Sequence, residues 1–192
     1  MDSNEQPEAW IALPSDDDVR AMLGDFKHPY ETFMGGVFPR MTRLIMAHPI
    51  IGKAFGHLSR AVNFADGALS RAEREMIAAV AASAQDCRYC MQHHAEFLRL
   101  EGGDPALTKA IKEYRWREFE GLTPRQRALC ELAEKLSATP TRMTQEDWKP
   151  LRDLGFDDRA CLEVAHIVGF YNYLTRFADG FGLQPTEARY PA

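Results

Sequence analysis

Long apolar runs are missing from this sequence of 192 residues. No stretch of about 18 apolar residues occurs, so we expect no membrane-spanning helix and no membrane partner. The first ten residues are polar and acidic, whereas a secretory signal begins with basic residues and continues with apolar ones. We therefore expect a cytoplasmic protein. Hydrophobic residues make up 45% and charged residues 27% of the chain, which is typical of a globular protein rather than a fibrous or disordered one.

An excess of basic charge is missing as well. The chain has 28 acidic and 23 basic residues, a formal net charge of −5, and no run of five or six like charges. Binding to a phosphate backbone requires a basic surface or arm. The composition therefore argues against nucleic acid as the main partner.

Cysteine is scarce, with four residues in the chain. A reducing cytosol does not favour a structural disulfide framework. Cys87 and Cys90 are separated by two residues, and in a cytoplasmic protein this CxxC spacing indicates redox chemistry or metal binding. Cys130 and Cys161 each stand alone on an apolar helix face, so we interpret them as core residues.

The alternation of polar and apolar residues that marks strands is almost absent. From Asp16 onward, apolar residues recur three and four positions apart, which predicts an all-α fold of successive helices. Because the length suits one domain, we predict an N-terminal arm over residues 1–15 and a single all-helical domain over residues 16–192. Pro39 is expected to kink or break the helix in which it falls. The predicted helices cover residues 16–26, 29–47, 48–63, 71–85, 87–101, 105–117, 124–138, 144–154 and 158–180.

One pattern in the chain repeats. Residues 69–74 align with residues 122–127, and both segments contain a capping box, Ser-x-x-Glu in the first and Thr-x-x-Gln in the second. Each is followed by a second helix that begins near an aspartate, with a histidine eight residues further on. The pattern fits an internal duplication of a helix pair of which only the first copy kept the chemistry. Coincidence is the alternative, because the spacers differ in length.

The CxxC pair is predicted to begin a helix. Asp86 is a suitable N-cap, which would place Cys87 at the first helical position and Cys90 within about the first turn. There the helix dipole and the free amide groups favour a thiolate, so Cys90 is a candidate nucleophile. His94 follows Cys90 at the i,i+4 spacing that lets side chains touch, whereas His93 lies on the flank of this face and ranks second.

Glu75 is the candidate that moves protons for this pair. It lies on the preceding helix, and the short connection before Cys87 would fold that helix back, so that Glu75 faces the dithiol. Tyr89, between the two cysteines, either packs in the core or hydrogen-bonds in the site. The structural alternative is that Glu75 is a solvated helix residue and that the cysteines pack in the core.

Zinc binding is the chemical alternative. Cys87, Cys90, His93 and His94 are four ligand types that zinc accepts. Four ligands on two turns of one helix cannot easily surround one ion, however, and structural zinc sites usually take their ligands from two separated pairs. We therefore expect no metal. Among the remaining histidines, His28, His48 and His57 are predicted at the surface or at caps, and His166 in the core.

These residues resemble the AhpD-like superfamily, which includes alkylhydroperoxidases and carboxymuconolactone decarboxylases. The resemblance rests on Glu75, Cys87, Cys90 and His94 at their spacing, embedded in the sequence that begins at Ser70. It extends over about residues 10–187. The peroxidase-related branch is the most similar, judged from the motifs Cys87-Arg88-Tyr89-Cys90, His93-His94, Leu122-Thr123-Pro124-Arg125 and Phe170-Tyr171-Asn172-Tyr173.

The resemblance implies a helical fold that forms a homo-oligomer and a dithiol that reduces hydroperoxides. In this scheme Cys90 attacks the peroxide and becomes a sulfenic acid, and Cys87 resolves it to a disulfide. His94 assists the thiolate, and Glu75 takes part in a proton relay. No bound cofactor is implied, because an external thiol, in some members a lipoyl-bearing protein, regenerates the dithiol.

Tyr89 departs from the family pattern, because characterised alkylhydroperoxidases have a histidine immediately before the second cysteine. A phenol is a poorer proton shuttle at neutral pH than an imidazole, so the relay is expected to be weaker or to run through His93 or water. The decarboxylase branch lacks the CxxC pair, which disfavours decarboxylation. Two functional hypotheses remain: a thiol peroxidase, and a thiol–disulfide oxidoreductase or redox-sensing module that acts on a protein partner.

Overall fold

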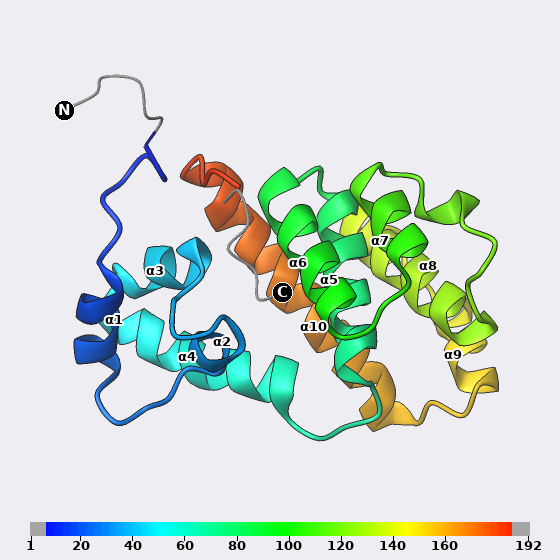
Figure 1. Ribbon diagram of the computed structural model, residues 1–192. Coiled ribbons are helices and arrows are strands. Elements are labelled where there is room, and N and C mark those ends of the chain that lie inside the picture. Colours follow the sequence, from blue (N-terminus) through cyan, green and yellow to red (C-terminus); the bar gives the residue numbers. More distant parts are fainter. Residues whose placement is uncertain (1–6, 186–192) are drawn as a thin grey trace. The chain divides into compact units, whose positions relative to one another are not determined.

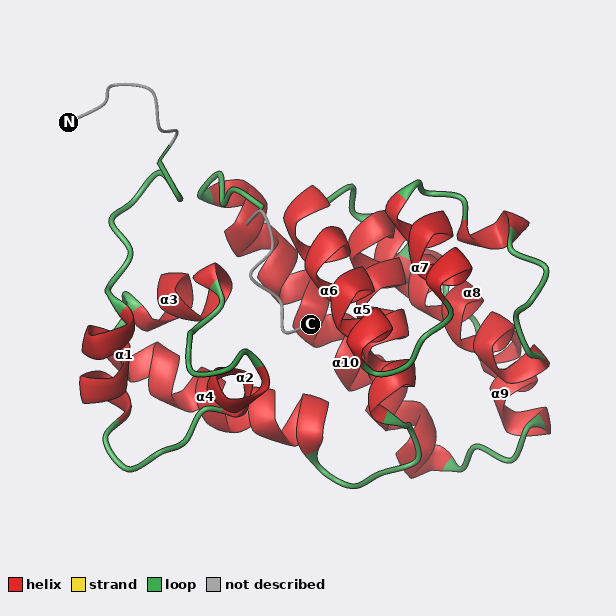
Figure 2. Cartoon of the chain, in the orientation of Figure 1, coloured by secondary structure: helices red, strands yellow, loops and turns green. Residues whose placement is uncertain are grey.

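The computed structural model describes residues 7–185, and every regular element in that range is a helix (Figure 2). The predicted all-α class is therefore confirmed. No helix in the described range is both long and apolar enough to cross a membrane. The α-helices are α1 Asp16–Leu23, α2 Pro29–Phe33, α3 Arg40–Met46, α4 Pro49–Phe64, α5 Arg71–Ala84, α6 Arg88–Leu100, α7 Pro105–Lys112, α8 Pro124–Ala138, α9 Lys149–Asp153 and α10 Asp158–Gly180.

The chain divides into two compact units. Among the described residues, the first unit consists of residues 7–61 and 176–185, and the second of residues 62–175. The prediction of one domain over residues 16–192 stays a prediction. Within the predicted arm, residues 1–6 lie outside the described residues, as does the segment 186–192.

In the first unit a small apolar core holds α1 and α3 together. Its buried members are Val19, Leu23, Phe38 and Met46. The segment before α1 is tied to the same unit, because the Trp10 amide donates to the Phe181 carbonyl at 2.8 Å. The helix predicted over residues 29–47 is broken in two, as expected from Pro39, since α2 ends at Phe33 and α3 begins at Arg40. Two glycines with positive φ, Gly35 and Gly36, followed by Pro39 explain the break.

The second unit is built around α5, which packs against α6 on one side and α8 on another (Figure 1). Residues 74–82 of α5 are buried without interruption, so this helix is covered all round rather than on one face. Alanine at four of these positions lets the neighbouring helices approach closely. Ionisable side chains on such a helix are therefore drawn into the interior.

Both predicted capping boxes are present at the N-termini of α5 and α8. The Ser70 side chain accepts from the Glu73 amide, and the Thr123 side chain accepts from the Gln126 amide. The helices that carry the two matching histidines, α6 and α10, are less similar, because His94 is buried and His166 is exposed. The exposure of His166 corrects its prediction as a core residue. The duplication itself stays a prediction.

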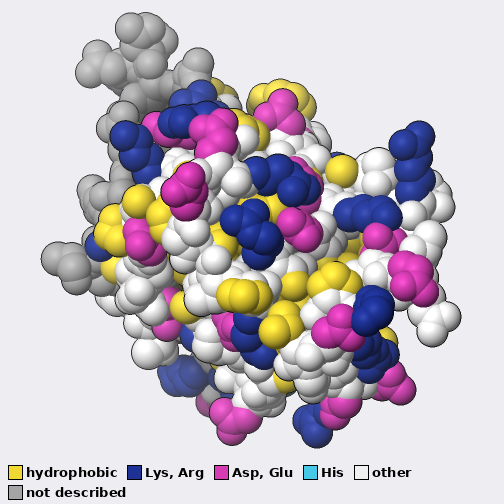
Figure 3. All heavy atoms as spheres, turned by 90° about the vertical axis from the view of Figure 1, so that its right-hand side faces the viewer, with side chains coloured by type: hydrophobic (Ala, Val, Ile, Leu, Met, Phe, Trp, Pro, Cys, Tyr) yellow, Lys and Arg dark blue, Asp and Glu magenta, His cyan; other side chains and the backbone are white. Residues whose placement is uncertain are grey.

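Two further helices are shorter than predicted. The segment over residues 105–117 forms α7 only as far as Lys112, because Tyr114 takes a positive φ of 60° and closes the helix. The segment over residues 144–154 begins as a 3₁₀ turn, Gln145–Trp148, before α9. On the side of the molecule seen in Figure 3, basic and acidic side chains alternate over the surface. That face carries no extended field of one sign.

Candidate functional site

The connection between α5 and α6 sets the geometry of the site. The Asp86 amide donates to the Ser83 carbonyl and the Cys87 amide to the Ala82 carbonyl, both at 3.0 Å. These two bonds form a Schellman motif, and Asp86 occupies its left-handed position with φ 54°. The chain therefore reverses within a few residues, and α6 returns along α5.

This connection corrects the prediction that Asp86 is the N-cap of the second helix. Cys87 is the N-cap, α6 begins at Arg88, and no side chain makes a capping hydrogen bond there. Cys90 is consequently the third residue of α6. A helix N-terminus without a carboxylate cap keeps its amide groups and its dipole available to stabilise a thiolate.

Glu75 and His94 form the centre of the site. Glu75 is completely buried in the middle of α5, and its Oε2 atom lies 2.5 Å from Nδ1 of His94 on α6. The expected approach of Glu75 to this face is thus seen in the structure. With Nδ1 bonded to the carboxylate, the lone pair of the neutral ring resides on Nε2. That nitrogen is the one able to accept a proton.

The charge on Glu75 is set by opposing effects. Burial acts most strongly and would raise the pKa of its carboxyl, but the Arg71 guanidinium and His94 together more than offset burial and lower that pKa below its usual value. Glu75 is therefore an ionised acceptor at neutral pH. Such a group orients and polarises an imidazole more readily than it donates a proton.

Arg71 was missed in the sequence analysis. It lies four residues before Glu75 on α5, and its guanidinium forms an ion pair with the Glu75 carboxylate. The sequence signal was the i,i+4 spacing of an arginine and a glutamate. That signal is common on solvated helices, and only the burial of Glu75 makes it specific.

Aromatic rings fix the plane of the His94 imidazole. The Tyr171 ring of α10 lies edge-on to it at 4.2 Å between centroids, and the Phe97 ring at 5.5 Å. The Tyr171 hydroxyl donates to Oδ1 of Asn63 at 2.6 Å, which holds Tyr171 in turn. The sequence did not indicate a role in the site for Tyr171 either, because this residue lies 77 positions beyond His94 and no local spacing relates the two.

The two cysteines of the motif are buried free thiols. They occupy the N-cap and the third position of α6, where i,i+3 neighbours share a face. Cys130 and Cys161 are also buried, as predicted. Burial raises the pKa of the Cys130 thiol to about 12, which leaves that residue without a thiolate at neutral pH.

Tyr89 and His93 form a second i,i+4 pair beside Cys90 and His94. Their rings lie 4.2 Å apart between centroids, and both residues are buried. Tyr89 therefore packs on His93. This arrangement places His93 against an aromatic ring on the flank of α6, as its position in the sequence suggested.

No group of three or more His, Cys, Asp or Glu side chains in residues 7–185 is placed to hold a metal ion. Among the other histidines, His48 and His57 are exposed as predicted, and His28 is buried at a cap, one of the two places predicted for it. His28 is the N-cap residue of α2, but only through its backbone.

Comparison with known proteins identifies relatives of this arrangement. Residues 49–104 match the Carboxymuconolactone decarboxylase family, and this segment contains Glu75, Cys87, Cys90 and His94. No curated protein matches the sequence.

Solved structures cover nearly the whole chain. A protein from Ralstonia eutropha JMP134, described as alkylhydroperoxidase AhpD core and an uncharacterized peroxidase-related protein, is 26% identical with a TM-score of 0.81, over 95% of each chain. An uncharacterized peroxidase-related protein from Silicibacter sp. TM1040 is 25% identical with a TM-score of 0.76, over 99% of this chain and 97% of that one.

The same fold also occurs in a different enzyme. The debrominase Bmp8, solved as a C82A variant in complex with 2,3,4-tribromopyrrole, has a TM-score of 0.77 over 97% of this chain and 95% of that one. At 19% identity this likeness shows the fold alone. It also shows that the fold accommodates more than one chemistry.

Proposed function

We propose that this chain, a member of the AhpD-like superfamily to which the Carboxymuconolactone decarboxylase family belongs, is a thiol-dependent peroxidase acting through Cys90 and Cys87. The observation that carries the proposal is the hydrogen bond between Glu75 and His94, because His94 lies on the same helix as Cys90. It supplies an oriented base one helical turn beyond the proposed nucleophile.

The first step is attack on the hydroperoxide. His94 takes the proton of the Cys90 thiol, and the thiolate sulfur attacks the outer oxygen of the O–O bond. The S–O bond forms as the O–O bond breaks, and the departing alkoxide or hydroxide recovers the proton from His94. The sulfur loses two electrons and becomes a sulfenic acid, and the hydroperoxide is reduced to an alcohol or water.

The second step closes the dithiol. The Cys87 thiol gives up its proton and its sulfur attacks the Cys90 sulfur, the S–O bond breaks, and the departing hydroxide takes up that proton and leaves as water as the disulfide forms. An external dithiol then returns two electrons and two protons and becomes a disulfide itself. The net reaction converts one hydroperoxide and one dithiol into an alcohol, water and a disulfide, so the protein needs no bound cofactor for it.

The burial of Cys87 and Cys90 restricts which substrates can reach them. Neither sulfur-bearing residue is more than 2% exposed, so a large flat protein surface could not reach them without rearrangement. Hydrogen peroxide or a small organic hydroperoxide, and a slender reductant such as a lipoyl arm, suit a buried dithiol better. This favours the peroxidase over an oxidoreductase acting on protein disulfides, which remains the second candidate.

Tyr89 limits the expected rate. Because its ring packs on His93 and replaces the histidine of characterised relatives, proton transfer depends on His94. We therefore propose a slower peroxidase than those relatives, with His94 as the single base. Homo-oligomer formation and a cytoplasmic location stay predictions, and light scattering of the purified chain tests the first.

The test is peroxide consumption by the purified protein with dihydrolipoamide or dithiothreitol as reductant. The proposal predicts turnover that Cys90→Ser abolishes and Cys130→Ser leaves unchanged. Turnover equal in wild type and Cys90→Ser would overturn the peroxidase. If the dithiol instead reduces or oxidises a disulfide-bonded protein while peroxide is untouched, the second candidate is correct.

Metal analysis tests the zinc alternative on the same material, purified without chelators. The peroxidase proposal predicts substoichiometric zinc. Near-stoichiometric zinc that is lost on replacing Cys87 and His94 would contradict it, because metal-bound thiolates are not free to cycle through a disulfide.

A further inference from the structure

Arg71 is the one charged side chain on α5 that pairs with Glu75, and the mechanism above leaves it without a role. We propose that Arg71 is a positioning residue that keeps Glu75 ionised, so that Glu75 accepts the hydrogen bond from His94 Nδ1 instead of donating one. This inference rests on the proposed function, because it assigns His94 the role of base.

Three contacts hold the Arg71 guanidinium in place. It pairs with Glu75, its Nε atom lies 3.8 Å from Oε1 of Glu101 at the end of α6, and its centre lies 4.2 Å from the centroid of the Phe64 ring. Its side chain is 17% exposed. A planar cation held between a ring and two carboxylates has little freedom to turn away from Glu75.

The charge matters because Glu75 is fully buried. An isolated carboxylate in such a position favours its protonated form. A protonated Glu75 would donate to Nδ1 of His94, and the imidazole would then carry its hydrogen on Nε2. An imidazole in that tautomer cannot take a proton from a thiol at Nε2, so the base would be lost while every side chain remained in place.

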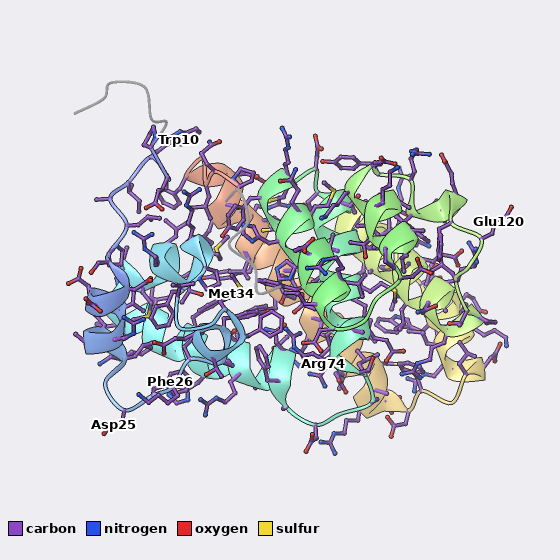
Figure 4. The ribbon with its side chains drawn as sticks, viewed as in Figure 1. Trp10, Asp25, Phe26, Met34, Arg74 and Glu120 are labelled. Carbon is purple, nitrogen blue, oxygen red and sulfur yellow. The ribbon has the colours of Figure 1, made fainter. Side chains whose placement is uncertain are left out.

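Other arginines near α5 are engaged elsewhere. Arg74, labelled in Figure 4, donates to the carbonyls of Val62, Ala65 and Leu69 and pairs with Glu163 of α10. From α8, Arg125 pairs with Glu73 at the N-terminus of α5. Both of these cations make their contacts near the N-terminus of α5. Arg71 and His94 are the positive or titratable groups that lower the pKa of Glu75.

The test compares Arg71→Gln with Arg125→Gln, its matched control, since each variant removes one arginine that pairs with a glutamate of α5. The readouts are the ¹³C chemical shift of the Glu75 carboxyl against pH and the pH profile of Cys90 alkylation by iodoacetamide. Neither requires peroxide. If the peroxidase proposal failed, these measurements would still report on Arg71.

Arg71→Gln is expected to move the Glu75 titration and the acid limb of the Cys90 profile to higher pH. At pH 7 the alkylation rate should fall about tenfold, the change that one unit of titration produces. Arg71→Lys keeps the charge and should restore most of the rate. Arg125→Gln should leave both profiles unchanged, and Glu101→Gln should leave the acid limb at or below its wild-type pH, because it frees Arg71 for Glu75.

Unchanged profiles in folded Arg71→Gln would overturn the inference. A loss of stability without a shift of either profile would mean that Arg71 is merely structural. Should Arg71→Gln not fold, the wild-type titration decides: a Glu75 carboxyl that remains ionised at pH 5 supports the role of Arg71, and one that is protonated at pH 6 contradicts it.

Discussion

The Nδ1 atom of His94 lies 2.5 Å from the Oε2 atom of Glu75, and both residues are buried although they come from different helices. The contact forms because the chain reverses direction tightly at Asp86, so that α6 returns along α5. It gives the two residues unequal roles. Glu75 orients the imidazole, and the other ring nitrogen of His94 is the one able to accept a proton.

Glu75→Gln should therefore reduce kcat more than it changes KM. Glutamine keeps the volume but removes the charge that fixes the His94 tautomer, so we expect kcat to fall about 100-fold. Peroxide turnover at varied substrate concentration measures this. Glu73→Gln is the matched control, because Glu73 lies on the same helix and pairs with Arg125 outside the site. A Glu75→Gln enzyme with wild-type kcat would remove Glu75 from the mechanism.

Cys90 should be oxidised by peroxide before any other cysteine. Cys130 is a matched comparison within the same chain: it is equally buried, but the pKa of its thiol is raised to about 12. Since the thiolate is the nucleophile, less than about one in a thousand Cys130 thiols is reactive at neutral pH. Mass spectrometry after a limiting dose of peroxide should find a Cys87–Cys90 disulfide and reduced Cys130. Equal oxidation of Cys130 would show that thiolate formation does not control the reaction.

The sequence predicted the members of the site better than their interactions. Cys87, Cys90 and His94 were identified from their CxxC and i,i+4 spacings. Glu75 was identified because a capping box and a short connection predict a helical hairpin, which brings its inner faces together. Arg71 could not be distinguished from the many arginines that pair on solvated helices. Its role depends on the burial of Glu75, which is a tertiary property.

For the fold, too, the predictions were correct where the local sequence determines the structure and wrong where tertiary packing does. Helices α8 and α10 have the predicted bounds, residues 124–138 and 158–180, and α10 continues through Gly169 without a break. Errors occurred where a residue took a positive φ, whether it was glycine, as at Gly35 and Gly36 between α2 and α3, or another residue type. Tyr114 ends α7 and Asp86 ends α5, and neither residue type signals a helix end strongly. Packing stabilises these conformations, so the local sequence does not reveal them.

Tyr171→Phe should lower stability with little effect on the His94 ring contact. The variant keeps the aromatic ring that lies on His94 but loses the hydroxyl that donates to Asn63. Losing a buried hydrogen bond while its acceptor stays buried costs about 1–3 kcal/mol. Urea unfolding followed by circular dichroism measures the change, and turnover per folded molecule should stay within about threefold of wild type. A large loss of turnover would instead assign the hydroxyl a role in proton transfer.

His28 should make the protein sensitive to mild acid. Burial, assisted by repulsion from Arg60, lowers the pKa of its imidazole from its ordinary value of 6.5 to about 4, so the folded state keeps it neutral. Unfolded chains bind a proton there below pH 6.5, so the stabilising contribution is complete above pH 6.5 and declines as the pH falls toward 4. The slope is about 1.4 kcal/mol per pH unit, or roughly 3 kcal/mol in all.

His28→Leu isolates this effect from the titration of other groups. Unfolding free energies of wild type and variant, measured between pH 4 and pH 7.5, should differ by an amount that changes across this range. The wild type should lose more stability on acidification than the variant. A constant difference would mean that His28 does not titrate on unfolding in this range.

Substitutions at Asp86 distinguish the two positions that this residue could hold. As an N-cap, the predicted role, serine would serve about as well as aspartate and glycine slightly worse. As the left-handed residue of a Schellman motif, the observed role, glycine would be better than aspartate by up to about 1 kcal/mol, and serine worse.

Asp86→Gly is therefore expected to be more stable than Asp86→Ser. Both variants lose the hydrogen bond between Asp86 and the Tyr114 hydroxyl, so the difference between them reports the backbone alone. Thermal unfolding of the three proteins side by side measures the order. Because this turn also places Cys87 at the head of α6, the glycine variant should retain the reactivity of Cys90. If Asp86→Ser were the more stable variant, Asp86 would act as an N-cap. The N-terminus of α6, which carries Cys87 and Cys90, would then not be uncapped.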